Sequence, residues 1–211
     1  MKKLTLALLA LSILSLIGQL LVLPYLPDTV PTHWNAAGEI DGYGSKYTNL
    51  FLAVLPLLML GLFALTPRID PRKESYEKHR KAYDIFRVFM TLFFIALTWV
   101  INAAAMGWPV DVGRIISIAL GVMFLVLGNY MPQIRSNYTF GIKTPWTLES
   151  PAVWKKTHAM GGIIFCVCGV LTIAAGIFAV SWAMYVMLAV ILLGSLWLYV
   201  YSWLLYRKER R

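Results

Sequence analysis

The sequence predicts an all-α integral membrane protein with six transmembrane helices and with both termini in the cytoplasm. Hydrophobic residues make up 59% of the 211 residues and charged residues only 14%, whereas a soluble domain has about 25% charged residues. The apolar residues occur in long blocks, and a helix that crosses a bilayer needs about 20 of them in succession. The basic residues are concentrated in a few of the connections between these blocks, which is typical of cytoplasmic connections.

The apolar blocks account for six spans. Four of them have the length of a single span, and they are 4–23, 47–66, 88–105 and 115–131. The block 159–206 has 48 residues without a charge, so it is long enough for two spans, and we expect their boundary at about Val180-Ser181-Trp182. We expect a single membrane unit, composed of a two-span hairpin over 1–66 and a four-span region over 67–211.

The first block is expected to stay in the protein as a span. Lys2 and Lys3 precede it, as they would in a signal peptide, but its apolar run of twenty residues exceeds the run of about 7–15 residues that signal peptides have. A cleavage site between small residues does not follow it, because the next residues are Leu23-Pro24-Tyr25.

The distribution of basic residues predicts the orientation. Seventeen of the nineteen Lys and Arg residues lie at the N-terminus, around the second and fourth connections, and at the C-terminus, which leaves Lys46 and Arg114 for the other side. Both termini are therefore expected in the cytoplasm and the loop 24–48 outside the cell. This orientation and the attraction of basic residues to anionic lipid account for the net charge of +9, so a nucleic-acid partner is not expected.

The loop 24–48 is expected to be ordered and to hold a ligand. Its prolines favour extended backbone and its glycines favour turns. The candidate binding residues lie in the middle of the loop, and they are Pro31, His33, Trp34, Gly38, Glu39 and Asp41. His33, Glu39 and Asp41 are residue types that bind zinc, but their spacing fits no known ligand motif. We therefore predict no metal, and the preferred interpretation is a hydrogen bond from His33 to a backbone group.

The second connection is expected to form a charged helix that continues into the third span. Asp70 can cap this helix, and Pro71 suits its first position. The preferred interpretation is a solvated extension of the span, because charged helix faces are usually solvated. A docking surface for another protein is the alternative.

The interior of the predicted spans offers packing features and little chemistry. Gln19 and Asn102 lie near span ends, where long side chains can reach the interface. Asp, Glu and His are absent from the span centres, which weighs against a proton-coupled pump, because pumps keep ionisable groups there. Gly162, Gly169 and Gly176 recur every seven residues in the fifth span and predict close helix packing.

The fourth connection, 132–158, carries the densest polar motif, and it is expected on the cytoplasmic side. The candidate residues are Asn129, Arg135, Asn137, Gly141, Lys143, Thr144, Pro145, Trp146, Leu148, Trp154 and His158. Gly141 permits an unusual backbone angle and Pro145 stiffens the turn. Ser150 can cap a helix that has Pro151 at its first position.

The side chains of this connection predict an ordered hairpin at the level of the lipid headgroups. Trp146 and Trp154 are expected to anchor in the interface, and Asn129 and Asn137 to bond loop carbonyls. Arg135 and Lys143 can hold a lipid phosphate, and His158 is a candidate base. Because a pair of nucleophile and base is not evident, we expect a structural hairpin with a headgroup site, not an enzyme, and no cofactor.

The two polar loops resemble the signatures of the SdpI family of bacterial membrane proteins and of the domain that often precedes the SdpI region. The SdpI signature reads G-N, a downstream Asn, G-I-[RK]-T-P-W-T-L, a Trp and often T-H, and its positions here are Gly128, Asn129, Asn137, 141–148, Trp154, Thr157 and His158. Many members have Arg in place of Lys143, which lacks the planar fork of Arg. The preceding domain reads L-P-x-x-[IV]-P-x-H-[WF] with a following Gly, and 26–34 and Gly38 match it.

The resemblance implies an immunity protein of the bacterial cytoplasmic membrane, whose partners are the lipid bilayer and a secreted antimicrobial peptide. It also implies signalling, because in the best-known system the immunity protein holds a transcriptional repressor at the membrane once the peptide is present. Two alternatives stay open on the residues alone. One is a transporter or flippase for a peptide or a lipid, and the other is a membrane-bound signalling receptor without an immunity role.

Overall fold

The protein is described by a computed structural model, which covers residues 2–35, 37–178 and 183–211. The expected boundary between the last two spans, at Val180-Ser181-Trp182, lies outside the described residues. The orientation of the termini stays a prediction.

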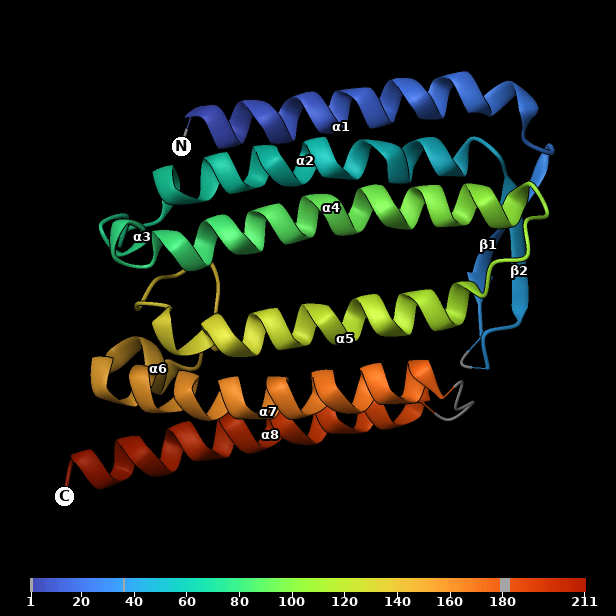
Figure 1. Cartoon of the computed structure of the whole chain (residues 1–211). Helices are drawn as coiled ribbons and strands as arrows, with labels where there is room; N and C mark the ends of the chain where they lie inside the picture. Colours follow the sequence, from blue (N-terminus) through green and yellow to red (C-terminus); the bar gives the residue numbers. More distant parts are fainter. Residues whose placement is uncertain (1, 36, 179–182) are drawn as a thin grey trace. The chain divides into compact units, whose positions relative to one another are not determined.

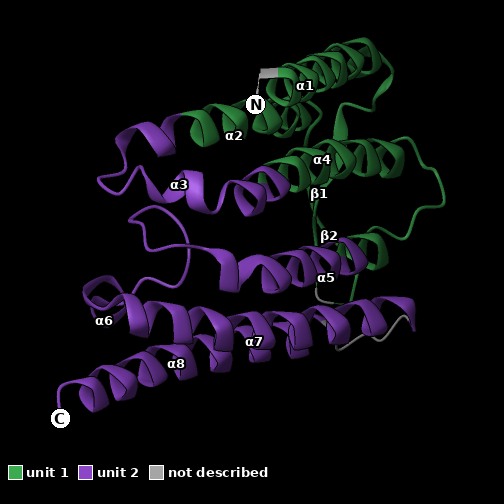
Figure 2. Ribbon diagram, turned by 60° about the vertical axis from the view of Figure 1, so that its left-hand side comes forward, with its two compact units in different colours: residues 1–64, 87–116 green, residues 65–86, 117–211 purple. Residues whose placement is uncertain are grey.

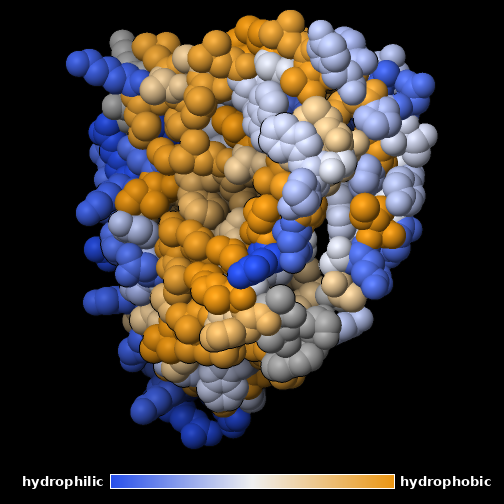
Figure 3. Space-filling model, turned by 45° about the vertical axis from the view of Figure 1, so that its right-hand side comes forward, coloured by the Kyte–Doolittle hydropathy of each residue, from blue (hydrophilic) through white to orange (hydrophobic). Residues whose placement is uncertain are grey.

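Within the described ranges, six helices are long and apolar enough to cross a membrane, which confirms the predicted fold class. They are α1 (Lys2–Val22), α2 (Thr48–Ile69), α4 (Arg80–Ala105), α5 (Val112–Tyr130), α7 (Pro151–Ile177) and α8 (Ala183–Glu209) (Figure 1). Large apolar side chains on these helices are exposed, and apolar atoms cover much of the helical surface in view (Figure 3). A surface of this kind is stable where lipid replaces water.

Shorter elements form the connections. They are η1 (Leu23–Tyr25), β1 (Thr29–Trp34), β2 (Ile40–Ser45), α3 (Ser75–Lys78), η2 (Met131–Gln133) and α6 (Pro145–Glu149). The strands β1 and β2 pair as an antiparallel hairpin. The prolines and glycines of this loop indicated extended backbone and turns, but the pairing of the two extended stretches was not predicted.

The chain divides into two compact units, residues 1–64 with 87–116 and residues 65–86 with 117–211 (Figure 2). The first unit contains α1, the hairpin β1–β2, and parts of α2, α4 and α5. The second contains α3, α6, α7, α8 and the remaining parts of the shared helices. The predicted division between residues 66 and 67 stays a prediction.

A chain of buried amides joins three helices of the first unit. The Asn49 side chain donates to Asn102 Oδ1 at 2.8 Å, and the Asn102 side chain donates to Gln19 Oε1. All three side chains are buried, so the expectation that Gln19 and Asn102 reach the interface was wrong. The reason is that each of the three side chains hydrogen-bonds a side chain of a neighbouring helix, a partner that lipid cannot supply.

Glycines bring α5 and α7 into close contact in the second unit. A Cβ atom on Gly128 would lie 2.7 Å from the carbonyl oxygen of Gly162, and one on Gly169 would lie 2.7 Å from that of Gly121. A Cβ on Gly176 would lie 2.9 Å from an α5 side chain. The predicted packing seam is therefore confirmed, and it explains the glycine at position 128, where the signature starts within α5.

Candidate functional site

Asp70 is the centre of the hydrogen bonds that join the second connection, residues 70–79, to the fourth connection, residues 132–158, which we call the motif loop. Its Oδ2 accepts from the Tyr138 backbone N–H at 2.9 Å, from the Tyr76 hydroxyl at 3.1 Å, and from Thr139 Oγ1, while its Oδ1 accepts from the Arg72 backbone N–H at 2.8 Å. Burial by itself raises the pKa of Asp70, but these hydrogen bonds more than offset burial and lower the pKa below its ordinary value. Asp70 is therefore a carboxylate that holds two segments together.

Arg72 forms further hydrogen bonds from the second connection to the motif loop. Its Nη2 donates to the Leu148 carbonyl at 2.9 Å, and its Nη1 donates to Ser136 Oγ. The guanidinium carbon lies 4.8 Å from the centre of the Tyr138 ring, a cation–π geometry. Ser75 adds a hydrogen bond from its hydroxyl to the Ser136 carbonyl at 2.7 Å. Nη1 and Nη2 of Arg72 therefore both donate to groups of the motif loop.

His79 is buried in an aromatic cluster between α3 and the motif loop. Its Nδ1 accepts from the Arg135 backbone N–H at 3.1 Å, and its ring centre lies 5.1 Å from that of Tyr76 and 5.2 Å from that of Phe140. Tyr83 packs on the same rings. Burial, and then the charge of Arg135, lower the pKa of His79 to about 4. His79 is therefore neutral at pH 7 and serves as an acceptor.

These contacts correct two expectations about the second connection. A continuous helix from Pro71 does not form, because α3 covers only Ser75–Lys78 and a break at His79 separates it from α4. Asp70 Oδ1 does accept from the Arg72 N–H, as a local cap would, but Asp70 Oδ2 accepts from the Tyr138 N–H of the motif loop. The segment is also not a solvated extension, since it docks on the motif loop of its own chain.

His158 holds the motif loop from inside. It is fully buried, its Nε2 accepts from the Ile142 backbone N–H at 3.0 Å, and its Nδ1 donates to the Trp154 carbonyl at 2.9 Å. These two bonds fix a neutral ring with its proton on Nδ1. The ring stacks on the Trp154 indole with centres 4.0 Å apart. Because both nitrogens are engaged in structural bonds, His158 is poorly placed to act as a base.

Trp154 corrects the expectation that both tryptophans anchor in the interface. Its side chain is only 2% exposed, and its Nε1 donates to the Ile134 carbonyl at 2.8 Å. The indole N–H therefore finds its partner inside the protein and does not need the headgroup layer. Trp146 is half-buried, with its ring edge-on to Tyr199 at 5.0 Å.

Gly141 is required at its position for two separate reasons. Its φ is 111°, a backbone conformation that side chains disfavour. A Cβ atom there would also lie 2.6 Å from His158 Nε2. The expected unusual backbone angle at Gly141 is confirmed.

Asn137 organises the turn that precedes Gly141. Its Oδ1 accepts from the backbone N–H groups of Thr139 at 2.9 Å and Phe140 at 2.8 Å, and its Nδ2 donates to the Arg135 carbonyl at 2.9 Å. The predicted bonding of a loop carbonyl by Asn137 is confirmed. Asn129 is exposed on the last turn of α5, so it stays outside this network.

Two capped helices follow the loop. Thr144 caps α6 by accepting from the Thr147 backbone N–H at 3.2 Å, and the Thr147 hydroxyl accepts from the Thr144 N–H at 2.8 Å, with Pro145 as the first helical residue. Ser150 caps α7 by accepting from the Val153 N–H at 3.2 Å, which confirms the predicted start of that helix. The helix α6 was not predicted.

Lys143 bonds two carbonyl groups at the exposed surface of the motif loop. Its Nζ donates to the carbonyls of Tyr138 at 3.2 Å and Thr139 at 2.8 Å. A compact ammonium group can serve both oxygens at once, so a planar guanidinium is not needed here. Both members of the predicted phosphate-binding pair, Arg135 and Lys143, are exposed, but the amine of Lys143 is already bonded to these two carbonyls.

Sequence reasoning missed the half of this site that comes from the second connection. The missed residues there are Arg72, Ser75, Tyr76 and His79. In the fourth connection Thr147 was named only as part of the signature 141–148, without the role that its bond to the Thr144 N–H gives it. The pattern T-P-W-T was a usable signal for Thr147, because two threonines three residues apart with a Pro between them suit a helix cap. The other residues gave no local signal, since their partners lie more than fifty residues away in the sequence.

The hairpin β1–β2, called the outer hairpin because the loop 24–48 is predicted to lie outside the cell, is held in the first unit by its first strand. In the hairpin register, Thr29 pairs with Ser45 and His33 with Gly42, with irregular pairing around His33. Val30 is fully buried and clusters with Leu26 and with Ala105 of α4. The loop is therefore ordered, as expected, and fixed to the helix ends.

The candidate ligand-binding residues of the hairpin separate into two groups. His33 Nδ1 lies 2.5 Å from Asp41 Oδ1, so His33 bonds a side chain across the hairpin and the expected backbone partner was wrong. Glu39 instead accepts from the Asn35 side chain at 3.1 Å, in a turn where Gly38 has a φ of 84°. Among the described residues, a group of three or more side chains placed to hold a metal is not found.

Pro31 and Trp34 are the remaining candidate ligand-binding residues of the hairpin. Pro31 is buried and Trp34 is half-buried, whereas His33 and Asp41 are exposed, with 70% and 45% of their side chains accessible. Exposed aromatic and apolar side chains lie on the same segment, and they are Tyr25, Ile40, Tyr43 and Tyr47. The hairpin therefore presents a polar pair together with aromatic surface, on a fixed backbone.

The fold and these two loops define a multi-pass protein of the cell membrane. Residues 133–202 match the model of the SdpI/YfhL protein family, and residues 10–60 match a domain of unknown function. The chain is 23% identical over 181 residues to immunity protein SdpI of Bacillus subtilis (strain 168), which covers 86% of this chain and 85% of that protein. No solved structure gives a significant match.

The family match and the similarity to immunity protein SdpI confirm the resemblance to the SdpI family that the sequence showed. The family match covers most of the motif loop and α6, α7 and the greater part of α8. The similarity to a curated immunity protein supports a function of the immunity type.

Proposed function

We propose that the protein gives its bacterium immunity to a secreted antimicrobial peptide, and that the outer hairpin is where the peptide is recognised. The class of function rests on the similarity to an immunity protein. The observation that supports the site is the exposed pair of His33 and Asp41 on a hairpin that also carries exposed tyrosines. This combination can hydrogen-bond a peptide and stack on its side chains.

The hairpin suits recognition because little of it has to become ordered on binding. Val30 is buried at its base, and an ion pair of 2.9 Å between Lys46 and Asp28 joins its two ends. Tyr side chains also lose little conformational entropy when they are immobilised. A preformed surface avoids part of the entropic cost of association, so even a small hairpin can bind usefully.

Survival of sensitive cells tests the proposal. Cells that lack an immunity protein would express this chain and receive culture supernatant of the bacterium that encodes it. We expect the wild-type chain to protect, His33→Ala and Asp41→Asn to protect less, and Thr32→Ala, a neighbouring exposed position on β1, to protect fully. Full protection by both hairpin variants would remove the hairpin from the mechanism, and killing of wild-type-expressing cells would remove the immunity function.

The proposal also requires that the hairpin face the side from which the peptide arrives. Reporter fusions near Trp34 and Trp146 would locate the two loops. We expect them in different compartments, with Trp34 outside, because most basic residues lie on the other side. Placement of Trp34 in the cytoplasm would overturn the recognition site.

A further inference from the structure

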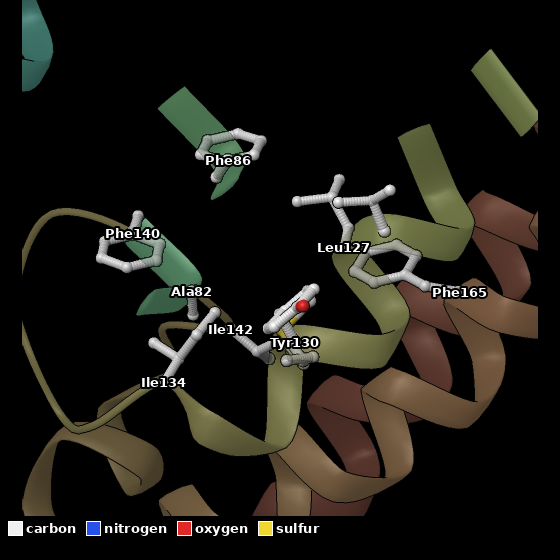
Figure 4. Close-up of a pocket in the computed structure, with 11 residues that line it drawn as sticks. Ala82, Phe86, Leu127, Tyr130, Ile134, Phe140, Ile142 and Phe165 are labelled. Carbon is white, nitrogen blue, oxygen red and sulfur yellow. The ribbon is translucent and has the colours of Figure 1, made fainter. Parts of the chain in front are cut away.

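An apolar cavity lies against the motif loop in the second unit. It has a volume of about 240 Å³ and is lined by side chains of α4, α5, α7 and the loop. In Figure 4 the labelled side chains surround an open space, with Phe86 and Phe140 on one side and Leu127, Tyr130 and Phe165 on the other. An apolar cavity of about 150 Å³ already stays dry and takes up benzene, so this one can hold a longer hydrocarbon segment.

The position of the cavity along the helices points to a hydrocarbon from the membrane. Phe86 lies near the start of α4 and Leu127 near the end of α5, so the cavity is located where the spans pass into the motif loop. At such a depth the surrounding solvent is lipid, whose chains are as apolar as the lining. An acyl chain is therefore the apolar ligand available in quantity at this place.

A second cavity adjoins the first and is basic. It has a volume of about 320 Å³ and shares Ile134 with the apolar cavity. Its wall includes Arg135, Ser136 and Lys155. Arg72 and Lys143 donate to carbonyls of the chain, whereas within the described residues the side chains of Arg135 and Lys155 show no such bond. Two cations thus line an open space next to an apolar cavity.

We propose that the second unit binds one anionic phospholipid, with an acyl chain in the apolar cavity and the phosphate between Arg135 and Lys155. Ile134 lines both cavities, so it lies between the proposed site of the acyl chain and the proposed site of the phosphate. Arg can hold a phosphate through two parallel N–H donors, and Lys adds a point charge. The site is separate from the outer hairpin and does not depend on the immunity function. The lipid would stabilise the docked second connection, because Phe140 contributes both to the cavity and to the cluster around His79.

Native mass spectrometry of the purified full-length protein tests this site. The protein would be exchanged into detergent and titrated with phosphatidylglycerol or with phosphatidylcholine of the same acyl chains. We expect one tightly held phosphatidylglycerol per chain and at least about tenfold weaker binding of phosphatidylcholine. Equal binding of the two lipids, or a retained peptide or second copy in place of lipid, would overturn the proposal.

Matched variants separate the two parts of the site. Leu127→Trp fills the cavity and should abolish lipid retention, while Val122→Trp, an exposed position on the same helix, should not. Arg135→Gln with Lys155→Gln should weaken phosphatidylglycerol about tenfold and remove the preference over phosphatidylcholine, whereas Lys156→Gln should leave both unchanged. Arg135 and Lys155 are exposed, so this pair tests the site even where Leu127→Trp fails to fold. Unchanged affinity in the double variant would refute the phosphate site.

Discussion

Replacement of Gly141 by alanine should destabilise the motif hairpin at its tightest point. The backbone at Gly141 has a φ of 111°, and a conformation of this kind costs an ordinary residue about 1–3 kcal/mol. The added Cβ would also lie 2.6 Å from His158 Nε2, so the ring must move. Movement breaks the bond of 3.0 Å from the Ile142 N–H and leaves buried polar groups without partners, which costs about another 1–3 kcal/mol.

The sum predicts a loss of roughly 2–6 kcal/mol in the free energy of unfolding, which corresponds to a fall in Tm of at least about 5 °C. Thermal unfolding of the protein in detergent, followed by size-exclusion chromatography with fluorescence detection, measures this fall. Gly61→Ala is the matched control, because Gly61 lies within α2 and a Cβ atom there meets nothing within 4 Å. Alanine at Gly61 should be neutral or slightly stabilising. Equal Tm values for Gly141→Ala and the wild-type chain would refute the reasoning.

Three further predictions follow from the contacts of the second unit. Gly128→Ala should lower stability by about 1–3 kcal/mol, because its Cβ would lie 2.7 Å from the backbone of α7; an unchanged Tm would contradict the glycine seam. Asp70→Asn should lower stability by about 1–3 kcal/mol at pH 7, since the amide replaces an acceptor that the Tyr138 N–H needs, and the loss should vanish at a pH below the depressed pKa of Asp70. The pKa of His79 is lowered to about 4 from an ordinary 6.5. The folded state therefore keeps His79 neutral at pH values where the unfolded chain protonates it, and the free energy of unfolding should fall by up to about 3 kcal/mol as the pH drops from 6.5 toward 4. Unfolding measured between pH 7 and 4 should show this fall in the wild-type chain and less of it in His79→Gln; identical pH profiles would contradict the burial of a neutral His79.

The features that the sequence predicted well are those set by local physics. Bilayer thickness fixes span length, so uninterrupted apolar blocks were sufficient to find six helices. Ser150 followed by Pro151 indicated a helix start because cap and first position are adjacent in the chain. Gly141 was recognisable because a backbone angle depends on the residue itself.

The features that it predicted poorly depend on partners far away in the chain. Asp70 was interpreted as a local cap, yet its second oxygen bonds Tyr138 and Thr139, more than sixty residues later. Trp154 lies near a span end, where tryptophan usually meets headgroups, but the Ile134 carbonyl satisfies its N–H inside the protein. In both cases the side chain had two chemically acceptable environments, and only the tertiary structure chooses between them.

The geometry of the motif loop also changes how the family signature should be interpreted. Asn137, Gly141 and His158 use their hydrogen-bonding groups or their missing side chain to build the loop, and none of them presents free chemistry to a ligand. A signature of this kind specifies a shape, so differences in what individual family members recognise must come from positions that the loop leaves exposed. In the second unit Arg135 and Lys155 are such positions, and in the first unit His33 and Asp41 are. Exchanging these exposed residues between two family members, with the buried signature kept, should therefore transfer ligand preference without loss of stability, whereas exchange of buried signature residues should affect stability alone.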